Sequence, residues 1–509
     1  MNGSLRRRPA VVAAVAMLVV AGQSLATPAI ASAPTLPLGA RNLPETRTTV
    51  TVQRGVTVTT ITRGVPDTTD TWTVEVASPN ASDPDPDAPK VALTSRSEAR
   101  ATAATLTSKG LLPRVERVRT PRVADYGGTL GYRVRVGSFT SSDAATSTVD
   151  KVAAAGFSGS AVYTGWDGDA GAKPSRGTWS IRVVTIDPLR FTGRLTGDYG
   201  PDLYDRETTS ALARAAGATV AVNAGFFVLD PAAGAPGDPA GVGVYNGRLV
   251  SETTNGRPAL IVGSNARARV ARMTWRGAVH GSSSTLRLSG LNRVPGLVRN
   301  CGAPGLQPTS RPQQDVTCTH ADEIVAFDSS YGATAPKDVA AEVVLNARGR
   351  VTSVDTTGGA AIPAHGRVLQ AIGTQARPLL ALARHSPRVS VRSSLYSAGR
   401  PVRLHRGETI VNGGPQLLRN GRVDATPGAD GMVHPGDPSF YYGWAHKRNP
   451  RTFAGYDGGG RLLLVTADGR STSSLGLSIS ETARVARALG MRTAMNLDGG
   501  GSTTMAIDG

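Results

Sequence analysis

The stretch Thr493-Ala-Met-Asn-Leu-Asp-Gly-Gly-Gly-Ser-Thr-Thr504 runs from a short apolar segment directly into a polar, glycine-rich loop. Its first half predicts a strand over Thr493–Leu497, which places the carboxylate of Asp498 at the strand tip. Three consecutive glycines lose much backbone entropy on folding, so they indicate a loop whose amide groups form an anion-binding nest. Because binding and catalytic groups gather in loops at strand ends, we predict a functional site here.

A helix is predicted just before this strand, beginning with Ser478-Ile-Ser-Glu481. This tetrapeptide fits a capping box, in which the serine hydroxyl and the glutamate carboxylate each accept a backbone N–H bond. Apolar residues recur with helical spacing up to Leu489, and Gly490 ends the helix. Glu481 therefore has two interpretations that the sequence leaves open, a helix cap and a second catalytic carboxylate.

Two further motifs place asparagine and glycine at the ends of predicted strands, Val222-Asn-Ala-Gly-Phe-Phe227 and Val411-Asn-Gly-Gly-Pro415. An asparagine amide both donates and accepts hydrogen bonds, so Asn223 and Asn412 suit a sugar hydroxyl or a phosphate oxygen. The glycine pair of the second motif would let a ligand approach the backbone closely. The alternatives are a turn asparagine bonded to its own backbone and an ordinary Asn-Gly hairpin.

The motif Asn449-Pro-Arg-Thr452 adds a cation. Arg451 is a candidate bidentate clamp for phosphate, and its alternative is a plain surface position in an arginine-rich chain. Further along, a predicted strand over Leu462–Thr466 leads into Asp468-Gly-Arg470. That tripeptide either supplies another carboxylate or is only a hairpin turn.

The size and charge of the chain narrow the classes of function. Its 509 residues predict two to four domains, and hydrophobic residues at 40% allow a sizeable core. The 56 basic residues exceed the 38 acidic ones, which gives a net charge of +18 and predicts attraction to polyanions such as wall polymers, membrane surfaces or nucleic acid. The arginines are scattered and are not interleaved with aromatic residues, so we expect no nucleic-acid partner.

Residues 1–33 are typical of a secretory signal peptide, with a cationic start at Arg6–Arg8 and an apolar run at Val11–Val20. A retained N-terminal anchor is the alternative, and no later segment is expected to span a membrane after signal cleavage. Outside the cytoplasm the two cysteines, Cys301 and Cys318, can form a disulfide that closes a Pro- and Gly-rich excursion. These features predict a secreted, cell-wall associated protein.

Residues 34–88 are expected to form a strand-rich N-terminal segment, with two exposed strands meeting at Arg54-Gly55, followed by a linker at Ser78–Pro89. An internal repeat follows in Lys90–Val118 and Tyr132–Tyr163, and each copy reads as strand, helix and strand. Two such copies predict a small ferredoxin-like βαββαβ module with its helices on one face.

The second copy, Tyr132-Arg-Val-Arg-Val-Gly-Ser-Phe-Thr140 with a closing Ala155-Gly-Phe157, resembles the sporulation-related repeat, or SPOR domain. The resemblance covers about residues 89–165. It implies binding to peptidoglycan, especially to glycan strands without peptides. A scaffold without a ligand is the alternative for this module.

The remainder, residues 177–509, resembles the phosphodiester glycosidase family, which releases a sugar from a phosphodiester. The resemblance rests on the four motifs above together with Leu463-Leu-Val465 and Asp468-Gly469, in the order of the family. It implies a strand-rich α+β catalytic domain, so the expected fold class of the whole chain is α+β. The chain ends at Gly509, before the closing strands usual in the family, so we expect a C-terminally truncated domain.

We therefore expect an exported hydrolase that cleaves a sugar, similar to N-acetylglucosamine, from a phosphodiester-linked glycan of the cell envelope. The expected partner is peptidoglycan or another anionic wall glycan, and the alternative function is a non-catalytic glycan-binding wall protein. The sequence leaves room for a divalent cation but contains no histidine cluster that argues for one. Asp498, Arg451, Glu481 and Asp468 are the candidate catalytic residues. The candidate substrate-binding residues are Asn223, Gly225, Asn412, Gly413, Gly414, Thr452, Asn496, Gly499, Gly500, Gly501, Ser502 and Thr503.

Overall fold

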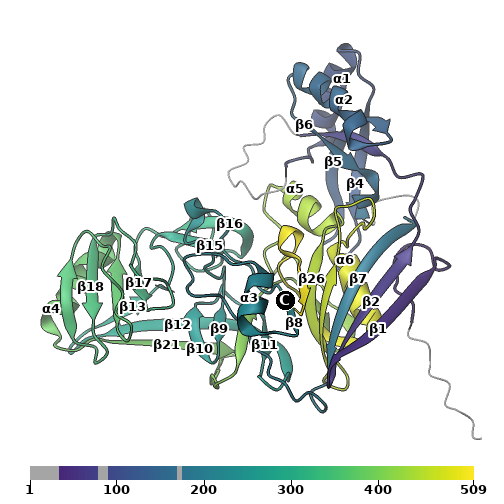
Figure 1. Cartoon of the computed structure of the whole chain (residues 1–509). Helices are drawn as coiled ribbons and strands as arrows, with labels where there is room; N and C mark the ends of the chain where they lie inside the picture. The colour runs from purple at the N-terminus through teal and green to yellow at the C-terminus, as the bar shows by residue number, and fades with distance from the viewer. Residues whose placement is uncertain (1–33, 78–89, 169–174, 509) are drawn as a thin grey trace, which may run out of the picture. The chain divides into compact units, whose positions relative to one another are not determined.

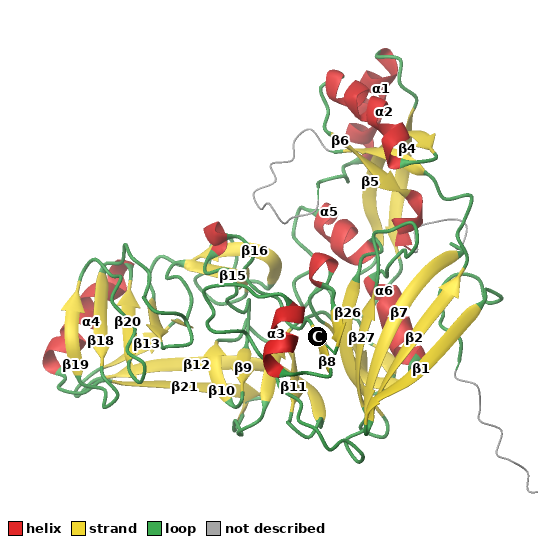
Figure 2. Cartoon of the chain, viewed as in Figure 1, coloured by secondary structure: helices red, strands yellow, loops and turns green. Residues whose placement is uncertain are grey.

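The computed structural model describes residues 34–77, 90–168 and 175–508. The predicted signal peptide and the whole predicted linker, Ser78–Pro89, lie outside these described residues. Within them the fold is strand-rich α+β, as predicted, and Figure 2 shows that strands make up most of its regular structure.

The central sheet is antiparallel throughout and has the order β1-β2-β7-β27-β26-β28-β24-β25. The predicted turn at Arg54-Gly55 is confirmed, but β2 is not simply exposed. It buries Val58 and Ile61 and lies between β1 and β7, because its alternating valines and isoleucine face the core. The strands are β1 (Glu45–Gln53), β2 (Val56–Gly64), β7 (Gly177–Ile186), β24 (Gln416–Arg419), β25 (Arg422–Val423), β26 (Arg451–Asp457), β27 (Leu462–Ala467) and β28 (Met491–Asn496).

Both faces of the central sheet are covered by apolar side chains. One face packs with the predicted helix, α6 (Ile479–Ala488), which Figure 1 shows lying against the sheet. On the other face Val184 and Met495 pack with Leu260 and Val411 of a second sheet. Burial of these aliphatic residues stabilises the layers by roughly 1.5–3 kcal/mol for each fully buried side chain.

The second sheet has the order β10-β9-β23-β11-β12-β21-β22, with β13 paired to β12. Its long strand β12 also leads toward a five-stranded sheet, β14-β17-β20-β18-β19, on which α4 packs through Leu379 and Leu382. The bounds of the first group are β9 (Gly243–Tyr245), β10 (Arg248–Ser251), β11 (Pro258–Val262), β12 (Ala268–His280), β13 (Thr285–Leu288), β21 (Ser390–Ser397), β22 (Arg400–Pro401) and β23 (Thr409–Asn412). Those of the second are β14 (Gly290–Leu291), β17 (Ile324–Phe327), β18 (Ala341–Leu345), β19 (Val351–Asp355), β20 (Arg367–Ala371) and α4 (Ala376–His385).

The remaining elements of this part are short. Two ribbons, β15-β16 and β8-β29, lie outside the larger sheets, and a π-helical segment, η5, follows α5 directly before β26. Their bounds are β8 (Val220–Val222), β15 (Leu297–Cys301), β16 (Gln313–Thr319), β29 (Met505–Ile507), α3 (Thr209–Ala216), α5 (Pro438–Tyr441), η3 (Pro231–Ala233), η4 (Gly373–Gln375), η5 (Tyr442–His446) and η6 (Gly500–Ser502).

The predicted ferredoxin-like module is present, with sheet order β4-β5-β3-β6 and both helices packed on one face. Its elements are β3 (Trp72–Val76), α1 (Arg96–Ser108), β4 (Pro113–Thr120), β5 (Gly128–Phe139), α2 (Ser142–Ala154) and β6 (Gly159–Tyr163), followed by η1 (Thr164–Trp166). The first strand was predicted wrongly at the start of the first repeat. There Thr94 makes only an isolated bridge to Tyr132, while Ala92 and Leu93 pack in the core shared with the central sheet, and β3 supplies the missing strand.

The predicted disulfide between Cys301 and Cys318 is formed, and both cysteines are fully buried. The first half of the segment between them is a mostly exposed loop, as predicted, but its second half belongs to β16, which pairs with β15 as an antiparallel ribbon. In the described part of the chain, no helix is long and apolar enough to cross a membrane.

We expect the double variant Cys301→Ala/Cys318→Ala to be less stable by about 3 kcal/mol, because the disulfide restricts the unfolded chain. The midpoint of urea denaturation, followed by circular dichroism, measures this loss. A reduced wild-type protein serves as the control and should unfold with the double variant. An unchanged midpoint in both would show that the ribbon is held by its strand pairing alone.

Candidate functional site

The predicted motifs meet because three neighbouring strands of the central sheet are antiparallel. Arg451, the first residue of β26, pairs with Ala467 at the end of β27. Asn496, the last residue of β28, pairs with Phe453 on the other side of β26. The loops that carry Arg451, Asp468 and Asp498 therefore leave the same edge of the sheet.

Asn223 is brought to this edge by the β8-β29 ribbon, in which Val222 pairs with Met505. Its amide Nδ2 donates to the carbonyl of Asp498 at 2.9 Å. Its Oδ1 accepts from the hydroxyl of Thr452 at 2.6 Å and from the amide of Thr504 at 3.1 Å. Asn223 thus ties the glycine-rich loop to β26, which is a more central position than an ordinary turn residue would have.

Asn412 and Asn496 are buried, and their amides hold loop backbone. Asn412 accepts from the amide of Phe226 at 2.8 Å and donates to its carbonyl at 3.1 Å. Asn496 donates to the carbonyls of Gly414 and Leu497 at 3.1 and 2.6 Å. These bonds give both asparagines a positioning role, which differs from the predicted contact with substrate.

The glycines next to these asparagines allow close approach, but the partner is protein. A Cβ at Gly225 would lie 2.9 Å from the carbonyl oxygen of Asn412, and one at Gly413 would lie 2.6 Å from that of Asn496. Both distances are too short for a side chain. Gly414 has φ +144°, a conformation that also favours glycine.

Arg451 is buried, and the structure gives it no carboxylate within ion-pair distance among the described residues. Its Nε donates to the carbonyl of Leu477 at 2.9 Å, and its Nη2 donates to the carbonyl of Trp444. Burial, and next the positive charge of Arg470, lower the pKa of Arg451 to about 9. A cation held by carbonyl groups in this way is electrostatically prepared for an anion.

Arg470 and Trp444 complete this corner of the site, and neither was predicted as a site residue. The exposed Arg470 donates through Nε to Asn449 at 2.8 Å, and its guanidinium lies 5.1 Å from the centre of the Trp444 ring. A Cβ at Gly500 would lie 3.5 Å from Nη2 of Arg470 and 3.7 Å from the Trp444 ring. The two arginines, hereafter the cation pair, therefore lie beside the glycine-rich loop.

The prediction that Gly499–Gly501 form an anion nest is wrong for two of the three amides. The amide of Gly499 donates to the carboxylate of Asp498 at 2.8 Å, and that of Gly500 donates to the carbonyl of Pro450 at 3.0 Å. The φ of Gly500, +60°, turns the loop so that these bonds form. Gly501 is exposed, with nothing within 4 Å of its Cβ position.

The hydroxyl residues of the loop lie partly buried behind these glycines. Ser502 closes the short η6 turn through its amide, which donates to the carbonyl of Gly499 at 3.1 Å. The hydroxyl of Thr503 is buried, and no hydrogen-bond partner for it is present in the described part of the protein. Thr503 therefore retains donor capacity for a ligand or an ordered water.

Glu481 is a helix cap and the partner of a buried arginine. Its carboxylate accepts from the amide of Ser478 at 2.9 Å, and the capping box with Ser478 is complete. The same carboxylate pairs with Arg448 at 2.7 Å, and both side chains are almost inaccessible. The capping interpretation is confirmed, and this geometry gives the carboxylate no free face for catalysis.

Asp468 is directed to β7, away from the glycine-rich loop. Its carboxylate, 46% exposed, pairs with Arg182 at 2.9 Å and accepts from the hydroxyl of Ser180 at 2.9 Å. Asp498, in contrast, directly precedes the two glycines, Gly499 and Gly500, that lie beside the cation pair.

No group of three or more His, Cys, Asp or Glu side chains suited to hold a metal ion occurs in the described ranges. The site is therefore characterised by one carboxylate, the cation pair and a glycine-rich loop.

Two parts of the chain match known protein families, and the chain is similar to solved structures. A family model described as phosphodiester glycosidase matches residues 340–509, and one described as SPOR domain matches residues 90–163. The crystal structure of a protein from Burkholderia pseudomallei, described as exported, is 32% identical, covers 93% of this chain and 94% of that one, and has a TM-score of 0.82. Residues 340–509 therefore match the phosphodiester glycosidase family. The SPOR domain of the chain is the ferredoxin-like module.

Two further solved structures are less similar to this chain. A protein from Synechocystis is 17% identical, covers 91% of this chain and 72% of that one, and has a TM-score of 0.50. The catalytic domain of zebrafish N-acetylglucosamine-1-phosphodiester alpha-N-acetylglucosaminidase, auto-inhibited by its pro-peptide, is 13% identical over 86% and 78% of the two chains, with a TM-score of 0.31. Similarity at that last level does not establish a shared fold. A search of the curated proteins finds no match.

We expect Glu481→Gln to destabilise the protein by about 3–5 kcal/mol, because it leaves the buried guanidinium of Arg448 without a counter-charge. Asp468→Asn is the matched control and should change stability by less than about 1 kcal/mol, since its ion pair is exposed. Urea denaturation of the two variants and the wild type measures the difference. Equal stability of all three would remove the structural role given to Glu481.

Proposed function

We propose that this chain is an exported hydrolase that releases a sugar from a phosphodiester-linked glycan of the cell envelope. The observation that carries the proposal is the cation pair, which lies beside the Asp498 loop without a carboxylate ion-paired to either arginine in the described residues. A phosphodiester supplies the negative charge that this corner lacks. The SPOR domain and the exported protein to which the chain is similar support the envelope location.

The bond chemistry fits a site with a single carboxylate. When the sugar C1–O bond breaks, the phosphate leaves as a stable anion and needs little protonation, so the acid of an ordinary glycosidase is less necessary. The departing charge needs stabilisation, and Arg451 and Arg470 would provide it. Asp498 would act on the anomeric carbon, either directly or through a water.

The neighbouring residues would hold these groups in place. Asn223 binds the backbone of Asp498 and the hydroxyl of Thr452, so it fixes the loop relative to β26. The carbonyl of Trp444 fixes the guanidinium of Arg451. Such preorganisation lets charges act at the moment of reaction without rearrangement.

One observation favours the alternative, a wall protein that grips glycans without turnover. Of the acidic side chains predicted to be catalytic, Glu481 and Asp468 are both held in ion pairs. Of these three carboxylates the proposed chemistry then depends on Asp498 alone, and turnover of a defined substrate decides between the two functions.

We expect the wild-type protein to release free sugar from a methyl phosphodiester of N-acetylglucosamine 1-phosphate or from a UDP-sugar. Asp498→Asn should lower this turnover by at least about a hundredfold, because it removes the proposed base or nucleophile. Asp424→Asn, at an edge of the same sheet and paired with Arg419, is the matched control and should retain activity. Retained turnover in a folded Asp498→Asn protein would remove Asp498 from the mechanism, and no release by folded wild type together with binding to purified walls would favour the alternative.

We expect Arg451→Gln and Arg470→Gln each to lower kcat/KM by about a hundredfold, since each removes one charge that stabilises the leaving phosphate. Inorganic phosphate should raise the melting temperature of the wild type, because a ligand that binds the folded state stabilises it, and it should not do so in Arg451→Gln. Arg419→Gln, exposed on β24, is the control. Equal stabilisation of all these proteins by phosphate would show that the anion binds elsewhere.

A further inference from the structure

The SPOR domain packs on the rest of the protein through the sheet face that its helices leave uncovered. Along β5, Val134 and Val136 point toward the core under α1 and α2. The alternate residues Arg133 and Arg135 lie on the opposite face, where they are only 6% and 2% exposed. Their burial means that this face is an internal interface of the folded chain.

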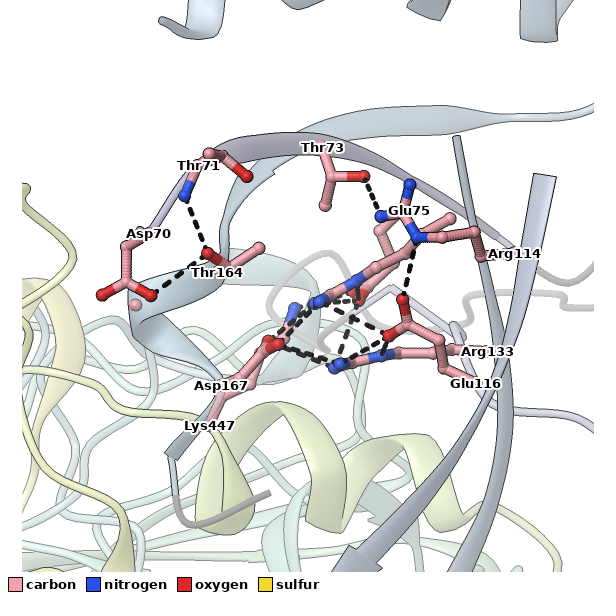
Figure 3. A network of polar contacts seen from close by, with 12 residues as sticks. Asp70, Thr71, Thr73, Glu75, Arg114, Glu116, Arg133, Thr164, Asp167 and Lys447 are labelled. Atoms are coloured by element: carbon pink, nitrogen blue, oxygen red, sulfur yellow. Dashed lines mark hydrogen bonds and ion pairs between the residues drawn. The ribbon is translucent and has the colours of Figure 1, made fainter. Parts of the chain in front are cut away.

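Charged side chains from both parts meet at this interface (Figure 3). Within the SPOR domain, Arg135 pairs with Glu75 at 2.9 Å and with Asp167 at 2.6 Å. Arg133 pairs with Asp167 at 2.8 Å and with Glu116 at 2.9 Å. These five residues carry two positive and three negative charges.

Residues 175–508, hereafter the catalytic part, supply the missing positive charge and a hydroxyl. Lys447 pairs with Glu75 at 2.7 Å. The hydroxyl of Tyr442 donates to Glu75 at 2.7 Å and accepts from Arg133 at 2.7 Å. With Lys447 included, three cations balance three carboxylates, and we call this set of seven residues the interface latch.

The buried carboxylates of the latch stay ionised. Burial alone would raise the pKa of Glu75, but Lys447, Arg135 and Arg133 keep it well below its ordinary value. Burial also opposes ionisation of Asp167, and Arg135 and Arg133 again keep its pKa far below the usual range. Since removing one member would leave an uncompensated buried charge, the latch joins the two parts rigidly.

The latch residues of the catalytic part flank the candidate site. Tyr442 begins η5 and Lys447 follows it, so the two enclose Trp444. Trp444 is the residue whose carbonyl binds Arg451 and whose ring lies under Arg470. A π-helical segment of this kind is frequent at functional sites.

A second set of contacts reaches the same site from η1. The indole of Trp166 donates to the carbonyl of Ser471, the residue after Arg470, at 3.3 Å. The carbonyl of Gly165 accepts from the side chain of Arg448 at 2.8 Å. The SPOR domain therefore contacts the segments that lead to both members of the cation pair.

We propose that the SPOR domain is a built-in positioning element of the active site, and that Lys447 and Tyr442 transmit its position to Trp444, Arg451 and Arg470. This proposal rests on the proposed function of that site. Lys447 and Tyr442 are positioning residues, because they act through Trp444. A glycan that occupied the helix-free face of the SPOR sheet would have to open the latch, so such binding would be coupled to catalysis.

The test compares three full-length variants. Lys447→Met removes the ion pair with Glu75 and unbalances the charge of the latch. Glu75→Gln/Lys447→Met removes the same ion pair and restores the balance. Arg114→Gln removes a half-exposed cation of the same sheet whose bonds, within the described residues, go to Gly137, Thr73 and Glu116. The readouts are kcat and KM on the methyl phosphodiester, thermal stability, and hydrogen exchange of residues 442–451 and 468–471 against 341–345 in the distant five-stranded sheet.

We expect Lys447→Met to lower kcat by about ten- to a hundredfold through misplacement of the cation pair. Exchange should accelerate at 442–451 and 468–471 and stay unchanged at 341–345. The double variant should recover thermal stability but keep the low kcat and the fast exchange, and Arg114→Gln should match the wild type.

Recovery of kcat and of slow exchange together with stability in the double variant would overturn the proposal, since the latch would then only stabilise the fold. Unchanged exchange at 442–451 in Lys447→Met would also overturn it. If the wild type showed no turnover, the proposed function would fail, but exchange would still decide whether the latch positions this segment.

Discussion

The antiparallel pairing of β26 with β27 on one side and with β28 on the other is the constraint on which the site depends. It sets Arg451 opposite Ala467 and Phe453 opposite Asn496, so two loops far apart in sequence leave the sheet together. Backbone hydrogen bonds fix this register, and a slip by one residue would turn Arg451 to the other face. The chemistry proposed for Asp498 and Arg451 follows from a property of the sheet.

At this edge of the sheet, the side-chain amides of three asparagines hold the loops in place. Asn412 holds the backbone of Phe226, Asn496 holds Gly414, and Asn223 joins Asp498 to Thr452. A buried amide that satisfies loop backbone avoids the penalty of unpaired polar groups and leaves few alternative loop conformations. The motifs that resemble the family therefore include residues that build the site as well as residues proposed to act in it.

The SPOR domain shares a core and a buried charge network with the part of the chain that holds the candidate site. Leu93 and Val118 pack in the same apolar cluster as Tyr441 and Tyr442. A flexible tether would leave the module free to move relative to the rest of the chain, whereas this interface includes Tyr442, the first residue of η5. The SPOR domain and the candidate site are thus parts of one packed structure.

The sequence by itself determined much of this protein. Periodicity and glycine placement predicted α6, β28 and β27 correctly, because these elements bury one apolar face and end at a strong local signal. The helix cap at Ser478 and the disulfide were also predicted correctly, because each depends on residues that are close together in the sequence. The candidate carboxylate Asp498 could also be named, because three glycines after a strand are rare without a function.

Only the tertiary structure decided how those residues are used. Gly499 and Gly500 looked like free donors, but their amides bind Asp498 and Pro450, and Glu481 binds Arg448. The first SPOR strand, β3, precedes the predicted linker in the sequence, whereas the helix α1 follows it. The repeat pattern, which begins after the linker, therefore did not include β3. The cation pair forms because the turn after β27 places Arg470 against Trp444 of the π-helical segment η5. Long-range packing determines such partners, because a hydrogen bond or an ion pair forms wherever the folded backbone brings two groups together. The spacing of residues along the sequence does not predict the distance between those groups in space.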